Sequence, residues 1–174
     1  MRQVIYSAAA SLDGYIARAD GSHDWIPMDP EIDFGAMFSR FDTVIMGRKA
    51  HDVTVAMEGP SPFSALETFV FSRSKKPGKH PGYEYREGSP GELIRELRKF
   101  PGKDIWLMGG GELARQFMAE DLIDGIQIGV IPVVLGGGIP LFGPGFRERQ
   151  FQFAGQRLYA GSGIVMLDYV RKSG

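Results

Sequence analysis

The sequence predicts an α/β domain of three layers, α/β/α, in which helices cover both faces of a mixed, mostly parallel sheet. Two observations predict this class. Strand patterns alternate with helical patterns through the middle of the chain, and two β-rich segments near its end have the pattern of an antiparallel hairpin. The 174 residues, 43% of them hydrophobic, contain no internal repeat or long linker, so we expect residues 1–174 to fold as a single domain.

The first third of the chain predicts a strand, a helix and a second strand. Val4–Ala10 is a run of β-branched, aromatic and small residues, which is typical of a buried strand. In Asp29–Phe41 four apolar residues fall at i, i+3, i+4 and i+7, which predicts a helix with one apolar face. Asp29 is the expected N-cap and Pro30 the first helical residue. Thr43–Met46 then predicts a short strand.

The middle of the chain repeats this alternation. Phe69–Ser72 predicts a strand, and Ser89 begins a helix because Glu92 follows at the capping-box spacing. Asp104–Met108 predicts the next strand, and a helix is expected over Glu112–Ala119.

The last third is expected to be mainly β-structure. Gly125–Val134 predicts a strand, and Gly136–Gly145 a long loop rich in glycine and proline. Phe151–Tyr159 and Gly163–Val170 predict the closing hairpin.

Composition excludes several classes of function. The net charge is −1, so the chain lacks the excess of Lys and Arg that binding to nucleic acid requires. It contains no cysteine and three scattered histidines, which argues against a metal site and agrees with a reducing cytoplasm. We expect no membrane span, because prolines and glycines interrupt the longest uncharged stretch, residues 126–146.

Two junctions between a strand and a helix have the character of phosphate-binding turns. Gly109, Gly110 and Gly111 would let a ligand approach the backbone and the free amides of a helix N-terminus. The alternative is that these glycines only permit a tight turn. Gly47 is followed by two cations, Arg48 and Lys49, whose positive charge at a helix N-terminus a bound anion would balance. The alternative here is a solvated pair of cations.

A third cluster follows a strand at Phe71–Lys76. Ser72, Arg73 and Ser74 supply hydroxyl and guanidinium donors that suit the phosphate of a ribose. Taken alone, the cluster is equally consistent with a polar loop.

Taken together, these motifs resemble the dihydrofolate reductase-like superfamily. The resemblance is greatest to the branch that contains the reductase domain of bifunctional riboflavin-biosynthesis proteins, the RibD C-terminal domain, and small stand-alone relatives. It extends from Val4 to about Val170 and is carried, in order, by the segments SAAASLDGYIA, DGSHDWIP, TVIMGRK, VFSRS, WLMGGGELARQFM and PVVLGGGIPLF. The resemblance implies a dihydrofolate reductase-like fold, NADPH as cofactor, a small-molecule substrate and a homodimer.

The resemblance also implies roles for individual residues. Ala9 and Ile16 match positions that meet the nicotinamide, and Ala8 and Trp25 match positions beside the substrate. The remaining cofactor positions are Gly47, Arg48 and Lys49 for phosphate, Ser72, Arg73 and Ser74 for the adenosine ribose and its extra phosphate, and Gly109, Gly110, Gly111, Glu112 and Leu113 for the pyrophosphate.

The substrate and the proton donor are left open. A dihydrofolate reductase would need a carboxylate after Trp25, and Asp29, Glu31 and Asp33 are candidates of which at most one has this role. Each could instead cap a helix. The preferred hypothesis is a 5-amino-6-(5-phosphoribosylamino)uracil reductase. The alternatives are a dihydrofolate reductase, a reductase of another substrate, and a dimeric NADPH-binding sensor without turnover. The sensor is favoured by Ala50, because members of the family that the chain resembles commonly have Gly-Arg-x-Thr here and the threonine hydroxyl is missing.

Overall fold

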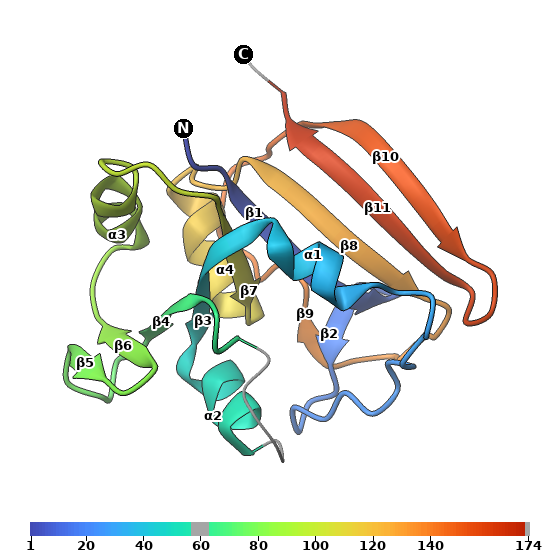
Figure 1. Ribbon diagram of the computed structural model, residues 1–174. Coiled ribbons are helices and arrows are strands. Elements are labelled where there is room, and N and C mark those ends of the chain that lie inside the picture. Colours follow the sequence, from blue (N-terminus) through green and yellow to red (C-terminus); the bar gives the residue numbers. More distant parts are fainter. Residues whose placement is uncertain (57–62, 173–174) are drawn as a thin grey trace.

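A nine-stranded sheet forms the centre of the molecule. The computed structural model describes residues 1–56 and 63–172 (Figure 1). The strand order is β10-β11-β8-β1-β7-β3-β4-β6-β5. Six adjacent strands are parallel to one another: β1 (Val4–Ser11), β3 (Phe41–Gly47), β4 (Glu67–Phe71), β6 (Tyr83–Arg86), β7 (Asp104–Gly109) and β8 (Gly125–Ile131).

Antiparallel strands complete both edges of this sheet. β5 (Gly78–His80) pairs with β6, and the hairpin of β10 (Phe151–Tyr159) and β11 (Ile164–Arg171) extends the sheet beyond β8. The mixed, mostly parallel sheet and the C-terminal hairpin are therefore confirmed. The edge pair β5–β6 was not expected from the sequence.

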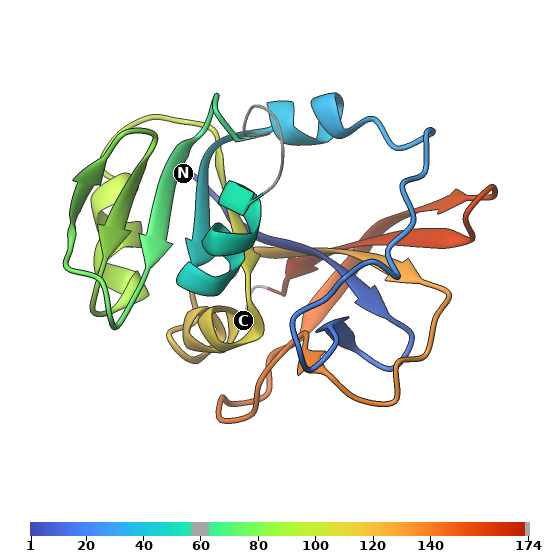
Figure 2. The ribbon, with the colours of Figure 1, turned by 90° about the horizontal axis from the view of Figure 1, so that it is seen from below.

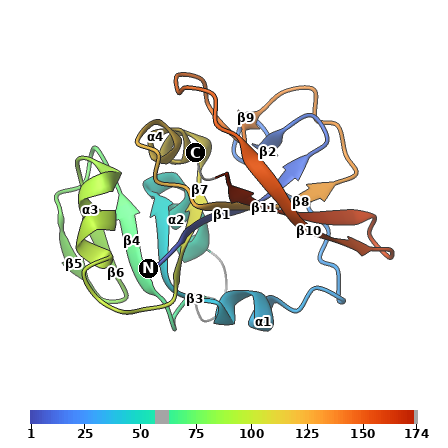
Figure 3. The same ribbon diagram turned by 90° about the horizontal axis from the view of Figure 1, so that it is seen from above.

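Helices cover both faces of the sheet, as Figures 2 and 3 show for α1 and α4. The helices of the described residues are α1 (Phe34–Ser39), α2 (Arg48–Ala56), α3 (Pro90–Leu97) and α4 (Gly111–Ala119). On one face, apolar residues of α3 and α4 pack in a cluster with Val4, Tyr6 and Ile45. On the other face, Phe38 of α1 and residues of α2 pack against a second cluster. Side chains therefore alternate between these two cores along each strand.

The helix expected over Asp29–Phe41 is shorter than its apolar pattern indicates. It begins at Phe34, and its N-cap is Asp33, whose Oδ1 accepts a hydrogen bond from the N–H of Ala36 at 2.8 Å. Asp29 instead closes a separate turn, because its Oδ1 accepts from the N–H of Glu31 and its carbonyl from that of Ile32. The prediction of Asp29 as N-cap and Pro30 as first helical residue is wrong, since the first aspartate stabilises a competing local turn.

Two boundaries near the end of the chain also differ from the expected ones. β8 ends at Ile131, before Pro132, rather than at Val134, because the N–H of Val133 turns back to the carbonyl of Ile131 at 2.7 Å. The loop expected over 136–145 contains β9 (Ile139–Pro140), which pairs with β2 (Tyr15–Ala17) in a separate two-stranded sheet. Among the described helices, none is both long and apolar enough to cross a lipid bilayer.

Candidate functional site

The two glycine junctions meet at the carboxyl ends of β3 and β7. These strands are adjacent and parallel, and Met46 lies opposite Gly109 in the register. A Cβ atom on Gly47 would lie 3.8 Å from the carbonyl oxygen of Gly109 and 3.9 Å from the nitrogen of Gly110. Gly109 has φ +103°, and the Gly109–Gly110 peptide is cis. The backbones of the two junctions therefore face one another across van der Waals distance.

The N-terminus of α4 opens onto this meeting point. Its N-cap is Gly110, which provides no side-chain hydrogen bond to the first turn. The N–H groups of the first helical residues, Gly111, Glu112 and Leu113, thus lack a side-chain cap, and the positive end of the helix dipole lies among them. Such a set of amide donors fits a diphosphate.

Glu112 in this first turn is held by its own helix. Its carboxylate accepts hydrogen bonds from Arg115, at 2.7 and 2.9 Å, and from Gln116 at 3.2 Å. These bonds, with a further contribution from the charge of Arg73, lower the pKa of Glu112 to about 2. The negative charge of Glu112 is thereby neutralised in part, which reduces its repulsion of an anion at the helix N-terminus.

The loop that contains β9 closes one end of the site. A Cβ atom on Gly111 would lie 2.3 Å from the carbonyl oxygen of Pro140, so loop and helix are in direct backbone contact. The hydroxyl of Tyr6 donates to the carbonyl of Leu141 at 2.9 Å. On the β2 side, Cδ1 of Ile16 lies 4.0 Å from where a Cβ on Gly110 would be. The predicted nicotinamide residue Ile16 therefore reaches the predicted pyrophosphate turn.

Asp13 fixes the same loop from its other side. Its carboxylate accepts hydrogen bonds from the N–H groups of Leu135 and Gly136, at 3.1 and 2.7 Å, and from the hydroxyl of Ser11 at 2.7 Å. The bond from Ser11 is the main reason that the pKa of Asp13 is lowered. Sequence reasoning missed the part that Asp13 plays in this site, although the Asp-Gly turn after the first strand was a signal for it.

The predicted phosphate-binding cations lie around the glycine junctions. Arg48 forms an ion pair with Asp52 one turn along α2 at 2.8 Å, and Lys49 is exposed. Arg73 is exposed and close enough to Glu112 to influence its pKa. Of these cations, Arg73 is the one whose charge reaches the first turn of α4.

The loop that carries Arg73 is held by Ser72. The Oγ of this buried serine accepts from the N–H groups of Ser74 and Lys75, at 3.2 and 3.0 Å. Ser72 thus shapes the loop, while the exposed Ser74 and Arg73 are free to face solvent.

The two predicted substrate residues, Ala8 and Trp25, are not brought together. Ala9 and Trp25 pack against the same apolar cluster of Ile131, Tyr159 and Ile164. Ala8 packs against the core on the opposite face of the sheet, because adjacent strand residues alternate in direction. The structure therefore places Ala9, and not Ala8, on the side of Trp25.

The three candidate proton donors occupy different positions. Asp29 is 5% exposed, and the nearby hydroxyl of Ser162, together with the hydrogen bond from the N–H of Glu31, lowers its pKa. An acid with a lowered pKa is ionised at neutral pH, which disfavours proton donation. Asp33 caps α1, and Glu31 is exposed.

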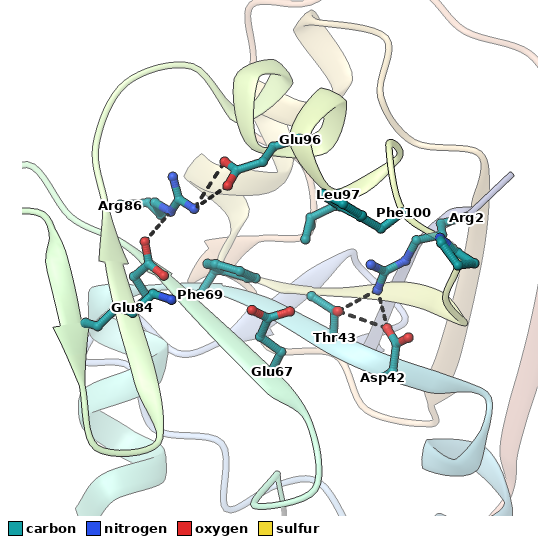
Figure 4. A pocket seen from close by; sticks show the side chains of 12 residues that line it. Arg2, Asp42, Thr43, Glu67, Phe69, Glu84, Arg86, Glu96, Leu97 and Phe100 are labelled. Atoms are coloured by element: carbon teal, nitrogen blue, oxygen red, sulfur yellow. Dashed lines mark hydrogen bonds and ion pairs between the residues drawn. The ribbon is translucent and has the colours of Figure 1, made fainter.

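A separate cavity of about 590 Å³ lies at the amino ends of β3, β4 and β6, away from the glycine junctions (Figure 4). Most charged groups around it are paired: Arg2 with Asp42, and Arg86 with Glu84 and Glu96. These ion pairs join α3 and the N-terminus to the sheet. The cavity does not contain the residues predicted to bind cofactor or substrate.

Comparison with known proteins agrees with the expected family. The model of the RibD C-terminal domain matches residues 2–165. A crystal structure of a Shewanella sp. PV-4 protein assigned to riboflavin biosynthesis is 30% identical, with a TM-score of 0.86, and the match covers 98% of this chain and 99% of that one.

Two more distant structures share the fold. A Thermotoga maritima diaminohydroxyphosphoribosylaminopyrimidine deaminase/5-amino-6-(5-phosphoribosylamino)uracil reductase is 16% identical, with a TM-score of 0.74 over 98% of this chain and 57% of that chain. Dihydrofolate reductase from Enterococcus faecalis, complexed with NADP(H), is 13% identical, with a TM-score of 0.72 over 98% and 97% of the two chains. The chain has the dihydrofolate reductase-like fold and belongs to the RibD C-terminal domain family.

Proposed function

We propose that this chain is an NADPH-dependent reductase of a pyrimidine ribosylamine, of the type of 5-amino-6-(5-phosphoribosylamino)uracil. The observation that carries the proposal is the meeting of two glycine junctions at a helix N-terminus that lacks a side-chain cap. This arrangement fits a diphosphate, and the exposed cations Lys49 and Arg73 lie at the same edge. Membership of the RibD C-terminal domain family supports the choice of cofactor and substrate class.

The residues present can hold each part of the cofactor. The amides of Gly111, Glu112 and Leu113 would bind the diphosphate, and Arg73 the extra phosphate that distinguishes NADPH from NADH. Ile16 and Ala9 would lie beside the nicotinamide. Bound NADPH supplies a hydride. The small side chain of Ala9 leaves room for the two reacting carbons to approach, while β2 and Trp25 restrict the entry of water.

The first test is the discrimination between the two nicotinamide cofactors. Arg73→Ala removes a charge-assisted bond to the extra phosphate, so its affinity for NADPH should fall about 10- to 100-fold while its affinity for NADH is unchanged. Fluorescence titration of each reduced cofactor measures both constants. Arg147→Ala removes another exposed cation and should alter neither. An equal loss for NADPH and NADH in Arg73→Ala would contradict the assignment.

Turnover separates the reductase from its alternatives. The wild-type protein should oxidise NADPH in the presence of 5-amino-6-(5-phosphoribosylamino)uracil, as measured by absorbance at 340 nm, and much more slowly with dihydrofolate. The opposite order would favour a dihydrofolate reductase. Tight binding of NADPH with no oxidation by either substrate would overturn the proposed substrate class and support a sensor or a reductase of another substrate.

A further inference from the structure

A row of polar side chains crosses three neighbouring strands on the side of the sheet that carries Ala9. Ser7 of β1 lies opposite Gln127 of β8, which lies opposite Asp168 of β11. Residues opposite one another in adjacent strands project to the same face. Ser7 precedes Ala9 by two residues, so its side chain also points to the face of Ala9 and Trp25. Figure 1 shows the three strands side by side.

This row separates two apolar clusters. On one side lie Ala9, Trp25 and Met166, and on the other lie Ile5 and Trp106. Ser7 is 8% exposed, whereas Gln127 and Asp168 are half-buried. Placing polar groups between two apolar clusters costs free energy unless each finds a partner, so the hydrogen bonds of the row determine its chemistry.

The hydrogen bonds of the row all run in one direction. The hydroxyl of Ser7 donates to Oε1 of Gln127 at 3.2 Å, and Nε2 of Gln127 donates to Oδ1 of Asp168 at 2.7 Å. A carboxylate can only accept, so the amide of Gln127 must turn its NH2 group to Asp168 and its oxygen to Ser7. The chain thus holds Asp168 by one oxygen and leaves the other as an acceptor.

Asp168 lies beside a residue of the outer strand that has no side chain. Its partner in β10 is Gly155, and a Cβ atom added there would meet no described heavy atom within 4 Å. No ion pair joins Asp168 to another residue of the described ranges 1–56 and 63–172. The carboxylate is therefore held by Gln127, half-buried and without a cation among the described residues, on the face of the sheet that carries Ala9. A ligand that binds this carboxylate must therefore offer an N–H donor.

The acids expected after Trp25 lie outside this row of side chains. Asp33 is occupied as the N-cap of α1, and Oδ1 of Asp29 accepts from the N–H of Glu31, while the buried Oδ2 of Asp29 has no hydrogen-bond partner among the described residues. We propose that Asp168, positioned by Gln127 and Ser7, is the substrate-recognition carboxylate of this chain and binds a ring N–H of the pyrimidine. This inference rests on the proposed function, since it names the group that selects the substrate of that same site.

The test compares two pyrimidines that differ in their ring N–H donors. The probes are 5,6-diaminouracil and 5,6-diamino-1,3-dimethyluracil, whose ring nitrogens carry methyl groups. Isothermal titration calorimetry, with and without saturating NADP⁺, measures the binding of each. The wild-type protein should bind diaminouracil about tenfold more tightly than the dimethyl compound, because a donor to a carboxylate is lost in the latter.

Three variants isolate the role of the carboxylate. Asp168→Asn retains the acceptor for Gln127 but replaces the free oxygen with an NH2 group, so it should bind diaminouracil about 10- to 100-fold more weakly and the dimethyl compound almost unchanged. Ser7→Ala only loosens Gln127 and should lose about two- to fivefold. Glu148→Gln, an exposed carboxylate elsewhere, should behave as the wild type.

The outcomes distinguish this inference from the proposed function. NADPH titration of Asp168→Asn should give the wild-type dissociation constant. If the wild-type protein does not bind NADPH but Asp168→Asn still loses its preference for diaminouracil, the cofactor assignment fails and the recognition role stands. If Asp168→Asn binds both pyrimidines as the wild type does, or if the wild type binds neither under both conditions, the recognition role is overturned.

Discussion

The two sides of the candidate site are built from different parts of the chain. The edge formed by β3, β7 and α4 consists of glycines and backbone amides, each in a short junction where a strand leads directly into a helix. The face formed by β1, β8 and β11 consists of side chains from Ser7, Gln127 and Asp168, which are far apart in sequence. On the first side an added Cβ atom at Gly111 would lie 2.3 Å from a backbone oxygen, whereas the second side consists of side chains. We therefore expect substitution of Gly111 on the first side to weaken cofactor binding and substitutions on the second side to change substrate selectivity.

The largest effect is expected at Gly111. In Gly111→Ala the new Cβ would lie 2.3 Å from the carbonyl oxygen of Pro140, and a backbone atom cannot move away as a flexible side chain can. We expect the dissociation constant of NADPH to rise at least about tenfold, and the free energy of unfolding to fall by about 1–3 kcal/mol. Fluorescence titration and urea denaturation measure the two quantities.

Gly137→Ala is the matched control in the loop that approaches Gly111. No described heavy atom lies within 4 Å of the Cβ that it would add, so both quantities should stay at their wild-type values. If Gly111→Ala also bound NADPH normally, the close contact between the loop and α4 would have no part in the cofactor site.

The same contrast explains what the sequence could predict. The glycine junctions were predictable because a strand, a glycine and a helix N-terminus are consecutive, and their amide chemistry is local. That Gly47 and Gly109 face one another then follows from the pairing of parallel β3 and β7. The resemblance to the family added Ile16, which no local pattern would have assigned to the site.

Other structural features could not be predicted from the sequence. Asp29 and Asp33 both have capping chemistry, and only the tertiary structure shows that the first closes a turn and the second begins the helix. The row of Ser7, Gln127 and Asp168 depends on the register of three strands. Two of them, β1 and β8, are separated by more than a hundred residues. Pairing between β2 and β9 is equally non-local, and each strand is too short to give a pattern.

A smaller effect is expected at Trp25, on the side-chain face. Trp25→Phe keeps an aromatic ring but reduces the apolar contact beside Ala9, so kcat/KM for 5-amino-6-(5-phosphoribosylamino)uracil should fall about tenfold. The dissociation constant of NADPH should change less than about twofold. Steady-state kinetics and cofactor titration give the two values. Phe100→Leu, an exposed aromatic residue at the far end of the sheet, should affect neither. A matching loss of NADPH affinity in Trp25→Phe would show that the two sides are not separable.

The smallest effect on stability is expected at Glu112, whose side chain lies on the edge formed by β3, β7 and α4. The pKa of Glu112 in the folded state is about 2, below the value of about 4.3 in an unfolded chain. Its bonds to Arg115 therefore stabilise the fold above pH 4.3, and this contribution is lost as the pH falls towards 2. Because the pair is exposed to solvent, the contribution is under about 1 kcal/mol.

Glu112→Gln should remove this part of the pH dependence. At pH 7 the variant should be slightly less stable than the wild type, and at pH 2.5 the two should converge, as measured by urea denaturation at each pH. Glu148→Gln serves as the control because its carboxylate is exposed. A difference that persists undiminished at pH 2.5 would show that Glu112 stabilises α4 by packing rather than by charge. In that case the charge of Glu112 would not be compensated by Arg115, and the backbone amides and the cations Lys49 and Arg73 would have to overcome its repulsion of a diphosphate.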